Sequence, residues 1–458
     1  MRQSSTLGTV AWTILAVLSA GCAGSAHAPG NHTTTSSGST TGVGGAPGAG
    51  GAATGEGGTG GSGATSSSTA SGSSSTTSSG AGAGGPTGPV PVPKTFGKKI
   101  YAHMLPWFET PASSSNGMWG THWTMANQNP NVISSNGQRQ IASYYYPMIG
   151  PYASSDHDVI EYQLLLMKYA GLDGVLIDWP GTIQAYDYPK NLNNCEAIMA
   201  LTAAVGLDFA VVYEDANVGA ASAAHFISNE IAAGQADVTY AQNTYFGQSN
   251  YIHVNGPPLL LDFGPQTFTT QSDWDQVLAP LSTKPTLITL WYESSMAGSD
   301  ASGEFAWLYQ DFLTGLTNFY QNHPVNVRFG VGYPGFNPFY AAGGWAGPTY
   351  TLPYNGTGTF VQTLGMAASS DAGYVQLATW NDYGEGTMIE PTVQFGYGFL
   401  TTLQQNLGVT YGQNELDLIN TLYNQRKQYA GNSAMQAMLD QAFNDLVSLQ
   451  VSAAASVL

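Results

Sequence analysis

Two carboxylic acids near the C-terminal end of the chain, Asp382 and Glu385, have the spacing and the surroundings of a catalytic pair. They lie three residues apart, beside Trp380 and directly after the apolar segment Tyr374–Ala378. This segment predicts a buried strand, and the chain turns after it, so both acids are expected to project from the same strand end. Cleavage of a glycosidic bond requires one acid that protonates the leaving oxygen and a second that acts as base, nucleophile or electrostatic partner. The pair therefore indicates glycosidic bond cleavage.

Polar and aromatic side chains also follow the other segments that have the pattern of buried strands. Those that we expect to bind substrate are His103, Asp178, Trp179, Glu214, Asp262, Tyr333 and Trp380. In a barrel of parallel strands all strand ends meet at one face, and active sites are built there. Sugars stack their apolar faces on aromatic side chains, so we expect Trp179 and Trp380 in the same cleft as the two acids. Glu390 is expected to brace the loop.

Short apolar segments alternate along the chain with segments of helical periodicity. The predicted strands are Lys99–Leu105, Gly174–Asp178, Asp208–Glu214, Pro258–Phe263, Thr286–Tyr292, Val327–Gly332 and Tyr374–Thr379. The predicted helices are Asp156–Ala170, Asn193–Val205, Ser222–Ala233, Ser272–Leu281, Gly303–Phe319, Asn414–Tyr429 and Ser433–Leu449. Such alternation is typical of a parallel sheet covered by helices. With an eighth strand at Ile141–Tyr146, the predicted fold class is α/β, a (β/α)8 TIM barrel with C-terminal helices.

The N-terminal part has the composition of an export signal followed by a linker. Residues 1–21 carry one early charge, Arg2, and then an apolar segment too short to cross a membrane as a permanent helix. The residues around Cys22 are similar to a bacterial lipobox, which predicts lipidation of Cys22; secretion after cleavage behind Ala28 is the alternative. Residues 22–93 are rich in Gly, Ser and Thr and predict a disordered tether. The barrel domain is expected at 94–458, on the cell surface or outer membrane as a lipoprotein, or secreted.

Composition limits the partners of the protein. The chain has 29 acidic and 11 basic residues, a formal net charge of −18, which argues against nucleic acid or an anionic membrane surface. We expect a polysaccharide or glycan substrate, membrane contact only through an N-terminal lipid, and a monomer. His103, His122 and His157 belong to no metal-binding motif, and no nucleotide-binding motif is present. We therefore expect no metal and no cofactor.

The motifs resemble two families of glycoside hydrolases. The closing motif Trp380–Glu385 and the opening segment Ile100–Met104 are similar to the α-1,3-glucanases of family 71. The segments that resemble family 99, the endo-α-mannosidases and endo-α-mannanases, are Tyr144–Pro147, Gly150–Asp156, Ala170–Trp179 and Gly386–Pro391. Both families are (β/α)8 barrels, so the resemblance implies the same fold that the order of elements predicts.

The resemblance to family 99 also implies roles for the acids. Asp382 would be the base that assists attack by the sugar's own 2-hydroxyl, Glu385 the general acid/base, and Glu214 a sugar contact. This chain has Asp382 where family 99 has Glu, whereas family 71 has Asp there and an inverting outcome, so both stereochemical outcomes stay open. The sequence thus predicts an exported glycoside hydrolase of α-glucanase or α-mannanase type. The alternative is a non-catalytic carbohydrate-binding barrel on the cell surface.

Overall fold

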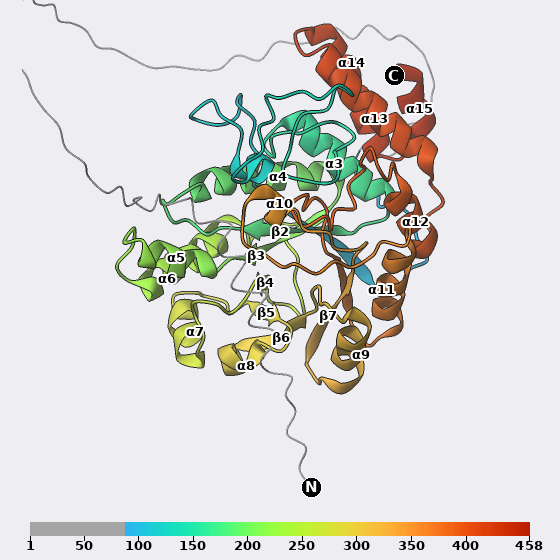
Figure 1. Ribbon diagram of the computed structural model, residues 1–458. Helices are drawn as coiled ribbons and strands as arrows, with labels where there is room; N and C mark the ends of the chain where they lie inside the picture. The colour runs from blue at the N-terminus through green and yellow to red at the C-terminus, as the bar shows by residue number, and fades with distance from the viewer. Residues whose placement is uncertain (1–87) are drawn as a thin grey trace, which may run out of the picture. The chain divides into compact units, whose positions relative to one another are not determined.

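The computed structural model describes residues 88–458, and the predicted signal segment, Cys22 and most of the predicted linker lie outside the described residues. Eight parallel strands follow one another in chain order and close into a barrel (Figure 1). They are β1 Lys99–Met104, β2 Gly174–Trp179, β3 Asp208–Tyr213, β4 Leu259–Asp262, β5 Thr286–Leu290, β6 Ala301–Phe305, β7 Val327–Gly332 and β8 Tyr374–Leu377. The predicted (β/α)8 barrel is therefore confirmed.

Helices surround the barrel between consecutive strands. They are α2 Thr121–Thr124, α3 His157–Tyr169, α4 Tyr188–Val205, α5 Ala216–Ala223, α6 Glu230–Thr244, α7 Gln271–Leu278, α8 Ser294–Ala297, α9 Phe312–Asn322, α10 Tyr340–Gly343 and α11 Gly358–Ser369. The helices that follow β8 are α12 Gly398–Leu407, α13 Gln413–Gln428, α14 Ser433–Val447 and α15 Val451–Val457. Within residues 88–458, none of them is both long and apolar enough to cross a lipid bilayer.

The register of the central strands places two acids next to each other. In the β2–β3 pair, Asp178 is opposite Val212 and Trp179 is opposite Tyr213. Glu214 follows directly, and its amide donates a hydrogen bond of 3.1 Å to the carbonyl of Trp179. Both strands are apolar and buried, as expected for strands that have the barrel interior on one side and helices on the other. Asp178 and Glu214 therefore emerge side by side at one end of the barrel.

One strand differs from the sequence prediction. The strand that completes the barrel is β6, whereas the predicted segment Ile141–Tyr146 is irregular. The helix predicted at Gly303–Phe319 is wrong at its start, because Gly303–Phe305 belongs to β6 and α9 begins at Phe312. The sequence of β6, Ala-Ser-Gly-Glu-Phe, lacks the continuous apolar residues that identify the other strands. A Cβ atom at Gly303 would lie 1.8 Å from the carbonyl oxygen of Val327, so glycine is required where β6 approaches β7. That requirement weakens the strand signal.

Capping residues set the helix boundaries. Asp156, predicted to begin a helix, accepts hydrogen bonds from the amides of Asp158 and Val159 at the start of α3. The helix predicted at Ser222–Ala233 is wrong, because α5 ends at Ala223 and α6 starts at Glu230. The side chain of Asn229 accepts from the amide of Ala232 and starts the new helix.

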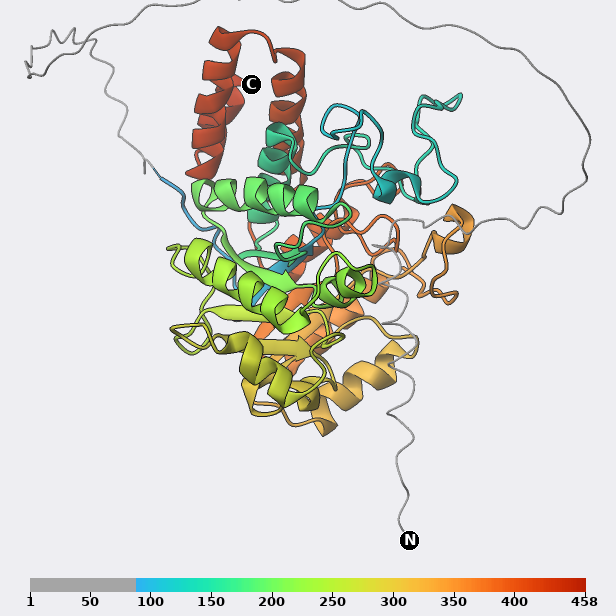
Figure 2. The ribbon, with the colours of Figure 1, turned by 90° about the vertical axis from the view of Figure 1, so that its left-hand side faces the viewer.

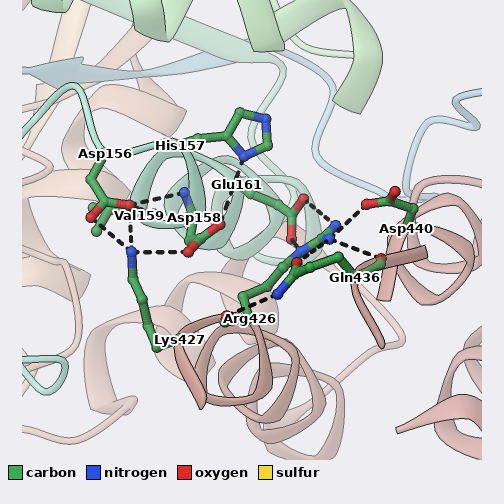
Figure 3. Close-up of polar contacts among 9 residues, drawn as sticks. All are labelled: Asp156, His157, Asp158, Val159, Glu161, Arg426, Lys427, Gln436 and Asp440. Atoms are coloured by element: carbon green, nitrogen blue, oxygen red, sulfur yellow. Dashed lines mark hydrogen bonds and ion pairs between the residues drawn. The ribbon is translucent and has the colours of Figure 1, made fainter. Parts of the chain in front are cut away.

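The C-terminal helices α13 and α14 pack against each other, and α13 lies beside α3 (Figures 1 and 2). Figure 3 shows the polar contacts that join them. Arg426 of α13 donates two hydrogen bonds to the buried carboxylate of Glu161, at 3.1 and 2.9 Å, and one of 2.6 Å to Asp440. Lys427 binds both oxygens of Asp156 at 2.6 and 2.7 Å. These charge pairs fix α3, and with it the end of the long segment that leads from β1.

Candidate active site

A pocket opens among the carboxyl ends of the barrel strands and the loops that follow them. Its lining combines acids, histidines and aromatic rings. The lining residues are His103, Leu105, Trp107, Phe108, His122, Met125, Asp178, Glu214, Phe263, Trp307, Tyr340, Trp345, Thr379, Asp382, Gly384 and Glu385. They follow seven of the eight strands, with β5 the exception. Active sites of such barrels are built at this face.

Asp382 and Glu385 lie together in this pocket, in the turn after β8. The amide of Asp382 donates to the hydroxyl of Thr379 at 2.9 Å, which fixes the start of the turn. The amide of Glu385 donates to Asp382 Oδ1 at 2.9 Å, so the turn itself holds the first carboxylate. The hydroxyl of Tyr340, from the loop after β7, donates to Glu385 Oε1 at 3.0 Å. Both acids are nearly completely buried, at 5 % and 3 % exposure.

The surroundings of the two acids separate their protonation states. Burial raises the pKa of Asp382 to about 6, although the amides of Glu385 and Gly384 stabilise its charge. Burial and then the charge of Asp382 raise the pKa of Glu385 well above its usual value, against the opposing hydrogen bond from Tyr340. Asp382 is therefore the acid that ionises more readily, and Glu385 is the one that retains its proton to higher pH. Such a pair can supply a base and a general acid at once.

Two further acids, Asp178 and Glu214, line the same pocket. Burial raises the pKa of Asp178 to about 7; a hydrogen bond with Glu214 lowers it, and the charge of Asp382 raises it. Burial and then the charge of Asp178 raise the pKa of Glu214 well above its usual value. Four acids from three widely separated parts of the sequence thus line one pocket.

The pocket histidines are neutral. His103 is buried, meets Trp307 edge-on at 4.8 Å between ring centroids, and has its pKa lowered by burial to about 4. His122 stacks on Trp107 at 4.1 Å with the two rings 5° from parallel, and burial lowers its pKa to about 3. Neutral imidazoles can donate and accept hydrogen bonds to sugar hydroxyls. No group of His, Cys, Asp and Glu within residues 88–458 has the arrangement of a metal site.

The other four predicted sugar-binding residues, Trp179, Asp262, Tyr333 and Trp380, lie outside the lining of the pocket. All four are completely buried. Trp179 faces away from the pocket, because successive side chains of a strand point to opposite faces and Asp178 faces the pocket. Its ring packs on that of Tyr213, with the ring centroids 5.5 Å apart. The prediction that Trp179 and Trp380 line the cleft therefore differs from their position in the structure.

Comparison with known proteins gives three findings. No protein-family model matches the chain. A glycoprotein endo-α-1,2-mannosidase-like protein of Danio rerio is 28 % identical over 99 residues, which are 20 % of this chain and 22 % of that protein. The family 99 endo-α-mannosidase of Bacteroides thetaiotaomicron superposes with a TM-score of 0.53 and 16 % identity over 71 % of this chain and 100 % of that one. A second structure of this endo-α-mannosidase, in complex with bis-tris propane, gives a TM-score of 0.50 and 18 % identity. This match covers 65 % of this chain and 88 % of that one.

In fold, the chain is family 99-like. The match to the Danio rerio protein spans about a fifth of that protein's length, 22 %. The structural matches are below 20 % identity, at 16 % and 18 %, and show the architecture of the barrel.

Sequence reasoning missed much of the pocket of this family 99-like barrel. Trp107, His122, Met125 and Trp345 come from long irregular segments after β1 and β7, where no periodicity predicts the direction of a side chain. Trp307 follows β6, the strand that was not predicted. The signal for the four rings among these residues is their aromatic or imidazole character, and Met125 carries none.

Glu390 lies outside the lining of the pocket and supports the loop after β8. Its buried carboxylate accepts hydrogen bonds from the hydroxyls of Tyr152 and Tyr383, both at 2.8 Å, and from the amide of Gln163 at 2.6 Å. Tyr152 in turn accepts from the side chain of Asn381 at 3.1 Å. These contacts agree with the expected bracing of the loop and join it to α3.

Proposed function

We propose that the chain is a glycoside hydrolase that cleaves α-linked glycan, with Asp382 as the base and Glu385 as the general acid/base. One observation supports this assignment above the others. The two acids share a pocket at the carboxyl ends of the strands, and their surroundings leave Asp382 with the lower pKa, about 6, and Glu385 with one well above its usual range. The family 99-like fold supports the same reaction class.

In the proposed reaction, Glu385 donates its proton to the oxygen of the leaving sugar as the glycosidic bond breaks. Asp382 removes a proton from the attacking group, which is a water molecule in an inverting route or the sugar's own 2-hydroxyl in a retaining one. In the retaining route, water then opens the resulting 1,2-anhydro sugar and gives a proton to Glu385, while Asp382 returns its proton to the 2-oxygen. The hydrogen bond from Glu385 N holds Asp382 in place for either step. The negative charges of the pocket then stabilise the positive charge that develops on the sugar ring.

The proposed substrate is a neutral glycan that contains α-mannose, with α-1,3-glucan as the comparison. No Lys or Arg is among the pocket-lining residues of the described chain, so nothing there would bind a uronate or a sulfated sugar. The aromatic rings of Trp107 and Trp345 offer faces for neutral sugar rings. The names of the similar proteins favour mannose.

The decisive experiment is Glu385→Gln, tested on a panel that includes α-mannan, α-1,3-glucan and polyuronate. We expect kcat/KM to fall by about a thousandfold or more, because the leaving oxygen loses its proton donor. The matched control is Glu230→Gln, an exposed glutamate of α6, which should retain full activity. Turnover by Glu385→Gln at the rate of the control would refute the assignment. NMR of the first anomer released distinguishes the retaining from the inverting route.

A further inference from the structure

Asp178 has no step in the reaction described above, yet it lies in the pocket at the end of β2. Its side chain is nearly buried, with 6 % exposure for the residue, and its Oδ1 has no hydrogen-bond partner among the described residues. Its main chain is held, since the thiol of Cys195 donates to its carbonyl at 3.2 Å. A buried carboxylate oxygen without a partner is unfavourable for stability. This group therefore needs an explanation other than folding.

Asp178 interacts with two other carboxyls of the pocket. In the β2–β3 register it is opposite Val212, two residues before Glu214, with which it shares a hydrogen bond. It also senses the charge of Asp382. Asp382 is in turn bound by the amide of Glu385 at 2.9 Å. Asp178 therefore interacts with Glu214 through a hydrogen bond and with Asp382 through its charge, and all of these acids line one pocket.

We propose that Asp178 is a positioning residue that orients the Glu214 carboxyl toward a sugar hydroxyl and places a second negative charge beside Asp382. This inference rests on the proposed function. Asp178 itself exchanges no atom with the substrate, because its effects pass through Glu214 and Asp382.

Protonation supports the same arrangement. Burial raises the pKa of Asp178 to about 7 and that of Glu214 well above its usual range, and the charge of Asp178 further raises the pKa of Glu214. Coupling between two sites is reciprocal, so the charge of Asp178 must raise the pKa of Asp382 as the charge of Asp382 raises that of Asp178. Asparagine at position 178 would keep the size of the side chain and a hydrogen bond to Glu214, but it would remove the negative charge.

The test compares Asp178→Asn and Asp178→Ser with Asp275→Asn, which removes the same charge from an exposed position of α7. Two quantities are measured on each folded protein: kcat/KM from about pH 4 to about pH 9, and the titration of the Glu214 carboxyl by carbon-13 NMR. For Asp178→Asn we expect the acid limb of kcat/KM and the Glu214 titration to move to lower pH by about half a unit to one unit. For Asp178→Ser, which cannot hold Glu214, we expect KM to rise about tenfold. Asp275→Asn should change none of these.

The NMR titration needs no turnover, which separates this inference from the function on which it rests. An unchanged Glu214 titration together with an unchanged acid limb in both Asp178 variants overturns the inference, even when Glu385→Gln is inactive. A shifted Glu214 titration in a protein that cleaves no glycan supports the link between the two acids and refutes the hydrolase assignment. A shift in both quantities, absent from Asp275→Asn, supports both.

Discussion

At the scale of single residues, burial rather than a neighbouring cation sets the properties of the pocket acids. For Asp178, Glu214, Asp382 and Glu385, burial is the largest cause of a raised pKa. Asp382 differs from Glu385 because two main-chain amides stabilise its charge. The backbone of the turn after β8 therefore favours Asp382 over Glu385 for the proposed role of base. A change that reshapes this turn would disturb the chemistry without altering any reacting group.

The pH dependence of activity follows from this difference. Asp382 must be ionised, so kcat/KM should fall as the pH drops through about 6, the value to which burial raises its pKa. Glu385 must be protonated, so activity should persist well above the pH at which an ordinary glutamate has lost its proton. A pH–rate profile of kcat/KM measures both limbs. An acid limb near pH 4 would contradict the role of a buried Asp382.

The ionised form of Asp382, which the proposed reaction requires, should lower the stability of the folded protein. The pKa of Asp382 is raised in the folded state, to about 6, so its protonated form favours folding and its ionised form opposes it. Stability from this residue is present below the unfolded pKa, about 4, and is lost as the pH rises to about 6. Asp382→Asn should therefore gain free energy of unfolding relative to the wild type between these pH values. Equal pH dependence of the two proteins in urea titrations would exclude this effect.

The sequence could identify the acids but not the orientation of every neighbour. Asp178 and Glu214 were placed at strand ends by their position after apolar runs, and both line the pocket. Trp179 has the same sequence signal but faces away, because strand side chains alternate and the face that each takes depends on the closed barrel. Trp107 and His122 depend on a loop conformation that only the folded chain determines.

At the scale of elements, the seven apolar strands were predictable, and β6 was not, because its glycine fits a close approach to β7 and removes the apolar pattern. The C-terminal helices were predicted from their periodicity, whereas their contact with α3 was not. That contact depends on Arg426 and Glu161, which are far apart in the sequence and pair in a buried position, with side chains 6 % and 3 % exposed. Sequence spacing carries no signal for such a pair.

Breaking this pair should destabilise the protein strongly. Arg426→Met leaves Glu161 buried without its cation, which typically costs about 3–5 kcal/mol. The double variant Arg426→Met with Glu161→Met should recover most of that loss, because two apolar side chains replace two charges. Chemical denaturation of the single and double variants measures both effects. A double variant as unstable as the single one would show that packing, not the unpaired charge, is responsible.

At the scale of the whole molecule, the barrel explains the chemistry, and the N-terminal residues outside the described range explain the proposed location. We propose export with lipidation at Cys22, on the basis of the signal-like residues 1–21. Cys22→Ala should abolish incorporation of labelled palmitate and release the protein from the membrane fraction of a bacterial host. The matched control is Cys195→Ala, since Cys195 is buried in the barrel and should leave the label in place. Label retained by Cys22→Ala would refute the anchor.

The contact between α13 and α3 also has a practical meaning for shortened versions of the chain. The segment that supplies Trp107 and His122 ends at Asp156, whose carboxylate is bound by Lys427 of α13. A truncation placed between α12 and α13 would keep every strand and all four pocket acids while releasing one rim of the pocket. Expression trials that trim the last helices should therefore yield a barrel that binds its proposed glycan more weakly, an outcome easily mistaken for the wrong choice of substrate.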